Sequence, residues 1–346
     1  MLKGDSPINL QNIPPECARL CLRTERFVRE ELKLDLRGRS VLLALSGGPD
    51  SNALLLIFAL LRSRLGLKLH AAYLNHLLRD EADQEARFVR HLCDEYNVDC
   101  FLGKSRIAIY ALRMKMGLEQ AARVVRYRFL HGLASRNGYD FIFTGHHLND
   151  LAEDVLMRIL RGSGWPGLAG MRAVNGCIVR PLLLMSKEEI YFFLKELRQK
   201  WVEDKSNTER AFLRNRIRHD ILPLFFRENP NFLDQIAVLW KQGSTDRDFF
   251  SERIADLLVY KQENEICFNG RKLRDVHPAL RLRAYKKALE KLGPGQPLFK
   301  NIEKLDKAWL SGRGGRCIQF PGGKQAWIKS GDIMFKVDKN CMQRSR

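Results

Sequence analysis

One short segment near residue 46 constrains the fold more than any other part of this chain. An uninterrupted apolar run occupies residues 41–45, and residues 46–51 then read Ser-Gly-Gly-Pro-Asp-Ser. A helical pattern continues from Asn52 to about Leu65. Two consecutive glycines let the backbone approach a ligand closely, and the free N–H groups of a first helical turn favour an anion. The segment therefore predicts a strand, a phosphate-binding turn and a helix; a serine-capped turn without a ligand is the alternative.

The following residues alternate between strand and helix patterns, which predicts an α/β fold with a parallel sheet. The expected strands are residues 41–45, 69–74, 99–102, 141–144 and 177–180. The expected helices are residues 17–33, 52–65, 80–96, 118–137 and 148–161. We expect every strand to be apolar on both faces, as in a Rossmann-like sheet with helices on both faces.

Length and pattern together predict three regions, because 346 residues exceed one typical hydrophobic core. The first is an N-terminal helical extension, the second an α/β domain, and the third a basic, mostly helical C-terminal domain. Their predicted bounds are residues 1–38, 39–223 and 224–346. Short alternating runs at residues 316–320, 325–329 and 333–337 predict a small sheet at the end of the third region.

The chain is strongly basic. Its 59 Lys and Arg residues against 40 Asp and Glu residues give a net charge of +19 at pH 7. An excess of this size favours a polyanionic partner such as nucleic acid, and a solvated basic surface is the alternative. Clusters in the second half suit phosphate contacts. They comprise Arg214, Arg216 and Arg218, then Arg271, Lys272 and Arg274, then Arg281, Arg283, Lys286 and Lys287.

Composition disfavours two classes of protein. The eight cysteines are scattered and no two form a C-x-x-C pair, so we expect buried thiols in place of a zinc or iron–sulfur site. No uncharged apolar run reaches the roughly 18 residues of a membrane span, and residues 1–15 lack the pattern of a signal peptide. We therefore expect a cytoplasmic protein without a membrane partner.

Polar side chains follow three of the expected strands and should converge, because ligands bind at the carboxyl ends of parallel strands. They are residues 46–51 after the first strand, Asn75, His76 and Arg79 after the second, and Gly145, His146, His147 and Asp150 after the fourth. Asp150 and Glu153 share one helix face, where N-terminal capping is an alternative to metal binding. His146 and His147 are adjacent and cannot both face one way, so we expect one of them to be structural.

Several motifs, in order along the chain, make it similar to one known family. Residues 46–51 resemble the PP-loop of the N-type ATP pyrophosphatases, which adenylate a substrate. Further motifs look like those of tRNA(Ile)-lysidine synthetase in its short form. They are residues 74–79 (LNHLLR), 121–127 (AARVVRY), 144–153 (TGHHLNDLAE), 180–182 (RPL) and 212–218 (FLRNRIR). The departures from the family pattern are Asn149, Leu151, Asp154 and Lys205. Asp150 and Glu153 are retained, so the resemblance still implies metal binding.

The resemblance implies an adenylation followed by a ligation. ATP would adenylate the C2 carbonyl oxygen of the wobble cytidine in an isoleucine tRNA with a CAU anticodon, releasing pyrophosphate. The ε-amine of L-lysine would then displace AMP to give lysidine. The implied cofactors are ATP, as a substrate, and magnesium. The implied partners are this tRNA and lysine, and a homodimer is one of the oligomeric states left open.

The resemblance also implies roles for individual residues, although a solvated helix face is the alternative for the arginines. The implied catalytic residues are Asp50, Arg123, Asp150 and His146. The implied ATP-binding residues are Ser46, Gly47, Gly48, Pro49, Asp50, Ser51, Asn75, His76 and Gly145. The residues implied to contact tRNA or substrate are Arg79, Arg126, Arg214, Asn215 and Arg218. The residues implied to bind magnesium are Asp50, Asp150 and Glu153.

Two other functions stay open. A PP-loop tRNA sulfurtransferase would adenylate a base before sulfur attack, and it would need a reactive cysteine, for which Cys100 and Cys177 are the candidates. A non-catalytic RNA-binding module on an ATPase fold is disfavoured by the intact residues 46–51. Lysine-dependent release of AMP would separate these alternatives.

Overall fold

The computed structural model describes residues 9–77, 82–202, 212–262, 264–312 and 314–337. The chain divides into two compact units, Met1–Gln242 and Gly243–Arg346, and each has its own hydrophobic core. The boundary between the units lies within the long helix α10 (Phe232–Ala255). Within the described residues, no helix combines the length and apolar character that crossing a membrane requires.

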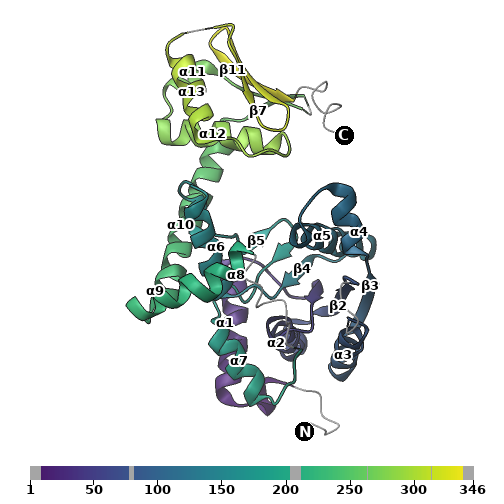
Figure 1. Ribbon diagram of the computed structural model, residues 1–346. Helices are drawn as coiled ribbons and strands as arrows, with labels where there is room; N and C mark the ends of the chain where they lie inside the picture. Colours follow the sequence, from purple (N-terminus) through teal and green to yellow (C-terminus); the bar gives the residue numbers. More distant parts are fainter. Residues whose placement is uncertain (1–8, 78–81, 203–211, 263, 313, 338–346) are drawn as a thin grey trace. The chain divides into compact units, whose positions relative to one another are not determined.

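The first unit is built on a six-stranded sheet in the order β3-β2-β1-β4-β6-β5 (Figure 1). Its strands are β1 (Ser40–Leu45), β2 (Lys68–Asn75), β3 (Asp99–Lys104), β4 (Phe141–Thr144), β5 (Val174–Asn175) and β6 (Ile178–Val179). All neighbouring strands are parallel except β5 and β6, so the predicted parallel sheet is confirmed and gains a short antiparallel edge. The strand order reverses beside β1, and the crevice at such a switch point is where ligands bind.

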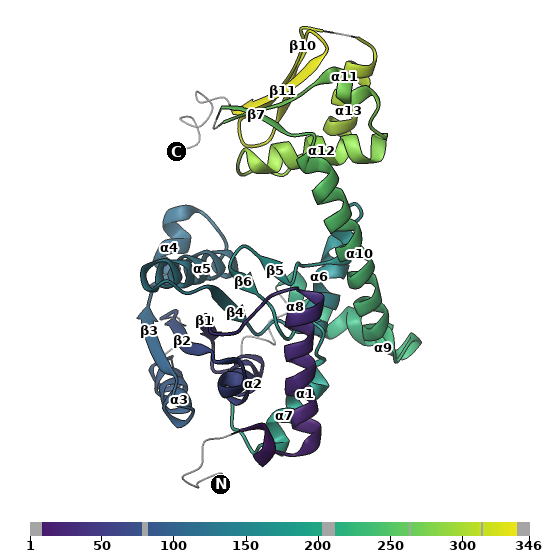
Figure 2. The ribbon, with the colours of Figure 1, turned by 180° about the vertical axis from the view of Figure 1, so that it is seen from behind.

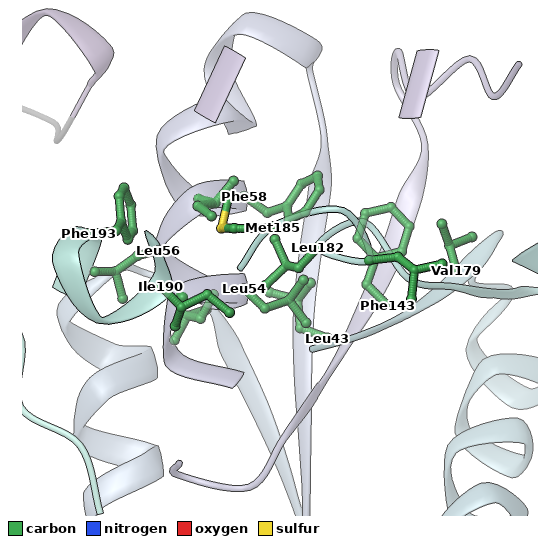
Figure 3. Packing of buried hydrophobic residues seen from close by; sticks show 14 of the residues in the cluster. Leu43, Leu54, Leu56, Phe58, Phe143, Val179, Leu182, Met185, Ile190 and Phe193 are labelled. Atoms are coloured by element: carbon green, nitrogen blue, oxygen red, sulfur yellow. The ribbon is translucent and has the colours of Figure 1, made fainter. Parts of the chain in front are cut away.

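Helices cover both faces of this sheet. Leu42 packs on the face covered by α5 (Leu118–Asn137), whereas Leu43 packs on the opposite face, and both are fully buried. Figure 3 shows Leu43 and Phe143 among the buried side chains of that second face. Full burial of each such side chain stabilises the fold by about 1.5–3 kcal/mol. The edge strand β3 has no buried residue, so the prediction of apolar burial on both faces is wrong for that strand.

Each of the five predicted helices of the first unit is present, with bounds within three residues of those expected once the π-helical turn after α1 is included. The helix α2 begins at Pro49, three residues before the predicted start at Asn52, because proline suits a first helical position that needs no N–H partner. The short helix α4 was not predicted.

Figure 2 shows α1 beside α7. The remaining bounds are α1 (Pro15–Arg26), a π-helical turn (Phe27–Glu31), α2 (Pro49–Leu65), α3 (Ala82–Glu95), α4 (Ile107–Met114), α6 (Leu148–Leu160), α7 (Lys187–Glu196), α8 (Leu213–Arg216), a second π-helical turn (Ile217–Ile221) and α9 (Leu222–Glu228).

The second unit contains a five-stranded antiparallel sheet in the order β7-β8-β11-β10-β9. Its elements are β7 (Val259–Gln262), β8 (Glu265–Phe268), α11 (Gly270–Arg274), α12 (Pro278–Lys291), α13 (Phe299–Leu310), β9 (Cys317–Phe320), β10 (Lys324–Lys329) and β11 (Asp332–Val337). The predicted small sheet is therefore present, with β7 and β8 added to it. Arg281 is buried and bonded to Asp306 through Nε at 2.6 Å and Nη2 at 2.8 Å. Its predicted contribution to phosphate binding is wrong, because the guanidinium is used inside the core.

Candidate active site

The turn after β1 has the geometry of an anion-binding turn. Gly47 has a φ of +81°, and a Cβ at this position would lie 3.3 Å from Cγ2 of Val89, so the position favours glycine. The Ser51 hydroxyl donates to the Gly48 carbonyl at 3.0 Å and accepts from the Ser46 N–H at 3.1 Å. Among the described side chains, none caps the start of α2 at Gly48. The N–H groups of this first turn therefore stay available to an anionic ligand.

The end of β4 packs directly against this turn. A Cβ at Gly145 would lie 2.9 Å from the carbonyl carbon and oxygen of Asp50 and 3.2 Å from the N–H nitrogen of Ser51. Glycine is therefore required where the loop after β4 passes the first turn of α2. This close approach brings together two groups of predicted site residues that are almost 100 positions apart in the sequence.

His147 lies between two carboxylates. Its Nε2 atom is 3.6 Å from Oδ2 of Asp50 and 3.6 Å from Oδ2 of Asp150, and its side chain is buried. The backbone N–H of His147 donates to Oδ2 of Asp150 at 3.1 Å. Burial lowers the pKa of His147, but the carboxylates of Asp150 and Asp50 outweigh burial and raise that pKa above its usual value. His147 thus joins the PP-loop helix α2 to the helix α6, a role that the sequence did not assign.

Asp150 and Glu153 of α6 are bonded to Arg214 and Arg218, and we call these four residues the carboxylate–arginine cluster. Arg214 donates from Nη2 to Asp150 and from Nε to Glu153, both at 2.6 Å. Arg218 donates to Glu153 from Nε at 2.5 Å and from Nη2 at 3.1 Å. Burial raises the pKa of Asp150, but His147 and Arg214 outweigh it and hold that pKa well below its usual range. Asp150 is therefore ionised, and both carboxylates are paired with protein cations.

This arrangement supports only part of the predicted magnesium site. Magnesium prefers oxygen ligands, and Oδ1 of Asp50 is buried and has no hydrogen-bond partner among the described residues. Asp150 and Glu153 do not fit as ligands, because guanidinium groups bind their oxygens. Within the part of the chain that the structure describes, no group of three His, Cys, Asp or Glu side chains could hold a metal ion. The magnesium prediction is therefore kept for Asp50 alone.

His146 has a different environment from its neighbour. Its Nδ1 atom lies 2.9 Å from the hydroxyl of Thr144. Burial lowers the pKa of His146 to about 3; Asp150 opposes this shift, and the positive charges of Arg180, Arg214 and Arg123 reinforce it. The imidazole is therefore neutral at pH 7. An imidazole with so low a pKa is a weak base, so it suits hydrogen bonding to a substrate better than removal of a proton from an ammonium group.

The predicted residues at the end of β2 that the structure describes are buried or half-buried. Asn75 is buried; its amide donates to Asp83 at 3.2 Å, and its carbonyl oxygen accepts from the Leu77 N–H at 2.8 Å. It therefore holds the turn after β2. Nε2 of His76 lies 3.3 Å from Nη2 of Arg126, and burial, with Arg126, lowers the pKa of His76 to about 4. The other predicted residue of this loop, at position 79, lies outside the described residues.

The remaining predicted arginine lies on α5. The guanidinium of Arg123 sits over the ring of Tyr127, 5.1 Å from its centroid. Both residues act electrostatically on Arg180, a buried residue after β6. No role was predicted for Arg180, although the sequence held two signals for it: it is a charged residue directly after an apolar run, and it begins the motif at residues 180–182.

Comparison with known proteins agrees with this geometry. Residues 22–225 match the model of the PP-loop domain family. The tRNA(Ile)-lysidine synthase of Nitratidesulfovibrio vulgaris is 40% identical over 321 residues, which cover 87% of this chain and 92% of that one. The tRNA(Ile)-lysidine synthase of Chlorobaculum tepidum is 40% identical over 330 residues, covering 92% and 98% of the two chains.

A solved structure shares the fold. The U34-tRNA thiolase of Methanococcus maripaludis, determined with its [4Fe-4S] cluster, matches 64% of this chain and 77% of its own with a TM-score of 0.53. Its sequence identity is 18%, so the likeness concerns the fold alone. The identities of about 40% over nearly complete chains are far more specific. The chain, which contains a PP-loop domain, therefore belongs to the tRNA(Ile)-lysidine synthase family.

Proposed function

We propose that this protein ligates L-lysine to C2 of the wobble cytidine of an isoleucine tRNA with a CAU anticodon. ATP first adenylates the C2 carbonyl oxygen and releases pyrophosphate, and the ε-amine of lysine then displaces AMP. The observation that carries this proposal is the uncapped PP-loop turn that contains Asp50, in a chain that matches 92% and 98% of the two lysidine synthases described above. We place the reaction in the cytoplasm, and a homodimer stays a prediction.

The turn at residues 46–51 supports a role in pyrophosphate release. Its free N–H groups and the dipole of α2 would stabilise negative charge on the departing phosphates. Magnesium, when bound through Asp50, would supply further positive charge at the phosphates. His147 would hold Asp50 and the start of α6 at a fixed separation, since it lies 3.6 Å from both Asp50 and Asp150.

Asp150 and His146 were both predicted to be catalytic, and the surroundings of each residue limit the role that it would have. Asp150 is held ionised, so it would act through its charge on His147 and on the cluster arginines, not as a proton donor. His146 is neutral and would hydrogen-bond to a substrate, with Arg123 nearby to balance phosphate charge. Arg214 and Arg218 would act by holding Asp150 and Glu153 in place, which replaces their predicted direct contact with tRNA.

The exposed basic residues of the second unit are the proposed tRNA-binding groups. Arg271, Lys272 and Arg274 on α11 are exposed, and all three can reach phosphates. Replacing Arg274 by Gln should weaken tRNA binding and reduce the slope of log affinity against log salt by about one unit. An unchanged slope would remove this residue from the proposed surface.

The direct test is analysis of nucleosides from tRNA incubated with the enzyme, ATP and isotopically labelled lysine. We expect one labelled nucleoside with the mass of lysidine, formed together with AMP and pyrophosphate. Omission of lysine should abolish the product, and a tRNA whose wobble base is not cytidine should not be modified. Formation of a thiolated base would instead support the sulfurtransferase.

A further inference from the structure

Arg180 is a buried arginine at the carboxyl end of the sheet. The strands β4 and β6 run parallel with Phe143 beside Val179, so the next register position places Arg180 beside Thr144. The hydroxyl of Thr144 is 2.9 Å from Nδ1 of His146. Arg180 therefore lies at the same edge of the sheet as the proposed substrate-binding histidine.

The guanidinium of Arg180 has hydrogen-bonding capacity left over. The residue is only 6% exposed. Its Nη1 donates to the carbonyl of Arg172 at 2.6 Å, but its buried Nε has no hydrogen-bond partner in the part of the chain that the structure describes. Among the described residues, no carboxylate oxygen lies within 4.0 Å of its nitrogens. The carboxylate of Asp154 acts on it electrostatically but is bonded to Arg158 at 2.7 Å.

A buried guanidinium without a counter-charge is costly, because the charge has lost its hydration and gained no ion pair. Arg123, which stacks over the ring of Tyr127 at 5.1 Å, adds repulsion, whereas Tyr127 itself favours the charged form of Arg180. His146 is neutral, so this corner of the site carries an excess of positive charge.

We propose that Arg180 and Arg123 form an anion-binding subsite next to His146, which binds an oxyanion of a small substrate. A guanidinium can donate two parallel hydrogen bonds to a phosphate or a carboxylate, and such charge-assisted pairs are strong when water is excluded. The subsite is separate from the PP-loop turn, because β6 lies on the opposite side of β4 from β1.

The inference rests on the proposed function, in which two small substrates carry a suitable oxyanion. One source is the α-phosphate of ATP, and the other is the α-carboxylate of lysine. Both present paired oxygens to the guanidinium. They differ in the step that they affect, because the phosphate is needed for adenylation and the carboxylate only for lysine transfer.

The test uses full-length protein carrying Arg180→Gln, with Arg180→Lys as a second variant that keeps the charge but not the planar pair of donors. Arg172→Gln is the matched control, because its side chain is exposed and only its backbone carbonyl contacts Arg180. KM is measured for ATP in pyrophosphate release, and for both lysine and lysinamide in product formation. Lysinamide keeps the ε-amine and lacks the carboxylate.

We expect Arg180→Gln to raise one KM by about 10- to 100-fold, Arg180→Lys to raise it less, and Arg172→Gln to leave it unchanged. If the carboxylate is the ligand, lysinamide is a poor substrate for the wild type, and the preference for lysine disappears in Arg180→Gln. If the phosphate is the ligand, KM for ATP rises and the preference for lysine is kept.

The inference is overturned if a folded Arg180 variant, checked by its melting temperature, keeps every KM within about twofold of the wild type. Should Arg180→Gln fail to fold, the same comparison is made with Arg180→Lys. Failure of the proposed function has a different signature, because the wild type itself would then form no lysine-dependent product.

Discussion

Arg214 allows the carboxylate–arginine cluster to be tested through protein stability. The change Arg214→Met keeps an apolar stem of similar length but removes the 2.6 Å bonds to Asp150 and Glu153. The side chain of Glu153 is 1% exposed, so water cannot replace the lost partner. We therefore expect the variant to fold with a smaller free energy of unfolding.

The magnitude follows from the contacts that remain. Removing one partner of a buried ion pair costs about 3–5 kcal/mol, because the other charge stays buried. Arg218 keeps its bonds to Glu153, so we expect the lower end of that range, about 3 kcal/mol. Asp150 has a depressed pKa in the folded state, and the stability that this provides is present above its unfolded pKa of about 3.9. The difference between wild type and variant should therefore be complete at pH 7 and shrink below about pH 4.

The assay is urea unfolding of the full-length protein at pH 7 for the wild type, Arg214→Met, Glu153→Gln and the double variant. The two changes should be coupled by more than about 1 kcal/mol, because Glu153→Gln removes the charge that Arg214 neutralises. Arg227→Met, at an exposed position of α9, is the control and should change stability by less than about 0.5 kcal/mol. A loss below about 1 kcal/mol in Arg214→Met, or additive effects in the double variant, would refute the cluster.

The reaction chemistry leads to further predictions. Asp50→Asn should leave folding and tRNA affinity intact while abolishing AMP formation, and unchanged turnover would contradict its role in pyrophosphate departure. Gly145→Ala should raise KM for ATP about tenfold or more, since the added methyl group would lie 2.9 Å from the Asp50 backbone, whereas Gly132→Ala, with open space around it, should have no effect. Replacing Cys100 and Cys177 by Ser, singly and together, should leave lysine incorporation within a few-fold of the wild type. Loss of product in a folded cysteine variant would favour the sulfurtransferase.

Much of the first unit could be predicted from local patterns. The strands β1, β2 and β4 are buried on both faces and read as apolar runs, and α5 has the bounds that its helical pattern predicts. The helix α4 could not be found in this way, because its exposed Leu112 obscures the apolar period. The strand β3 was found in sequence, but its exposure depends on its place at the sheet edge, which only the topology decides.

Sequence by itself determined the anion-binding turn, because its requirements are local: glycine at a positive φ, a free helical turn, and hydroxyls a few residues apart. Tertiary structure alone decided what the distant charges do. Arg214 and Arg218 lie more than 60 residues from Asp150 and Glu153, so sequence could assign the arginines to tRNA and the carboxylates to magnesium. In the folded chain, each buried charge must be neutralised by a partner within hydrogen-bonding distance. Here the two arginines neutralise the two carboxylates, and the carboxylates neutralise the arginines.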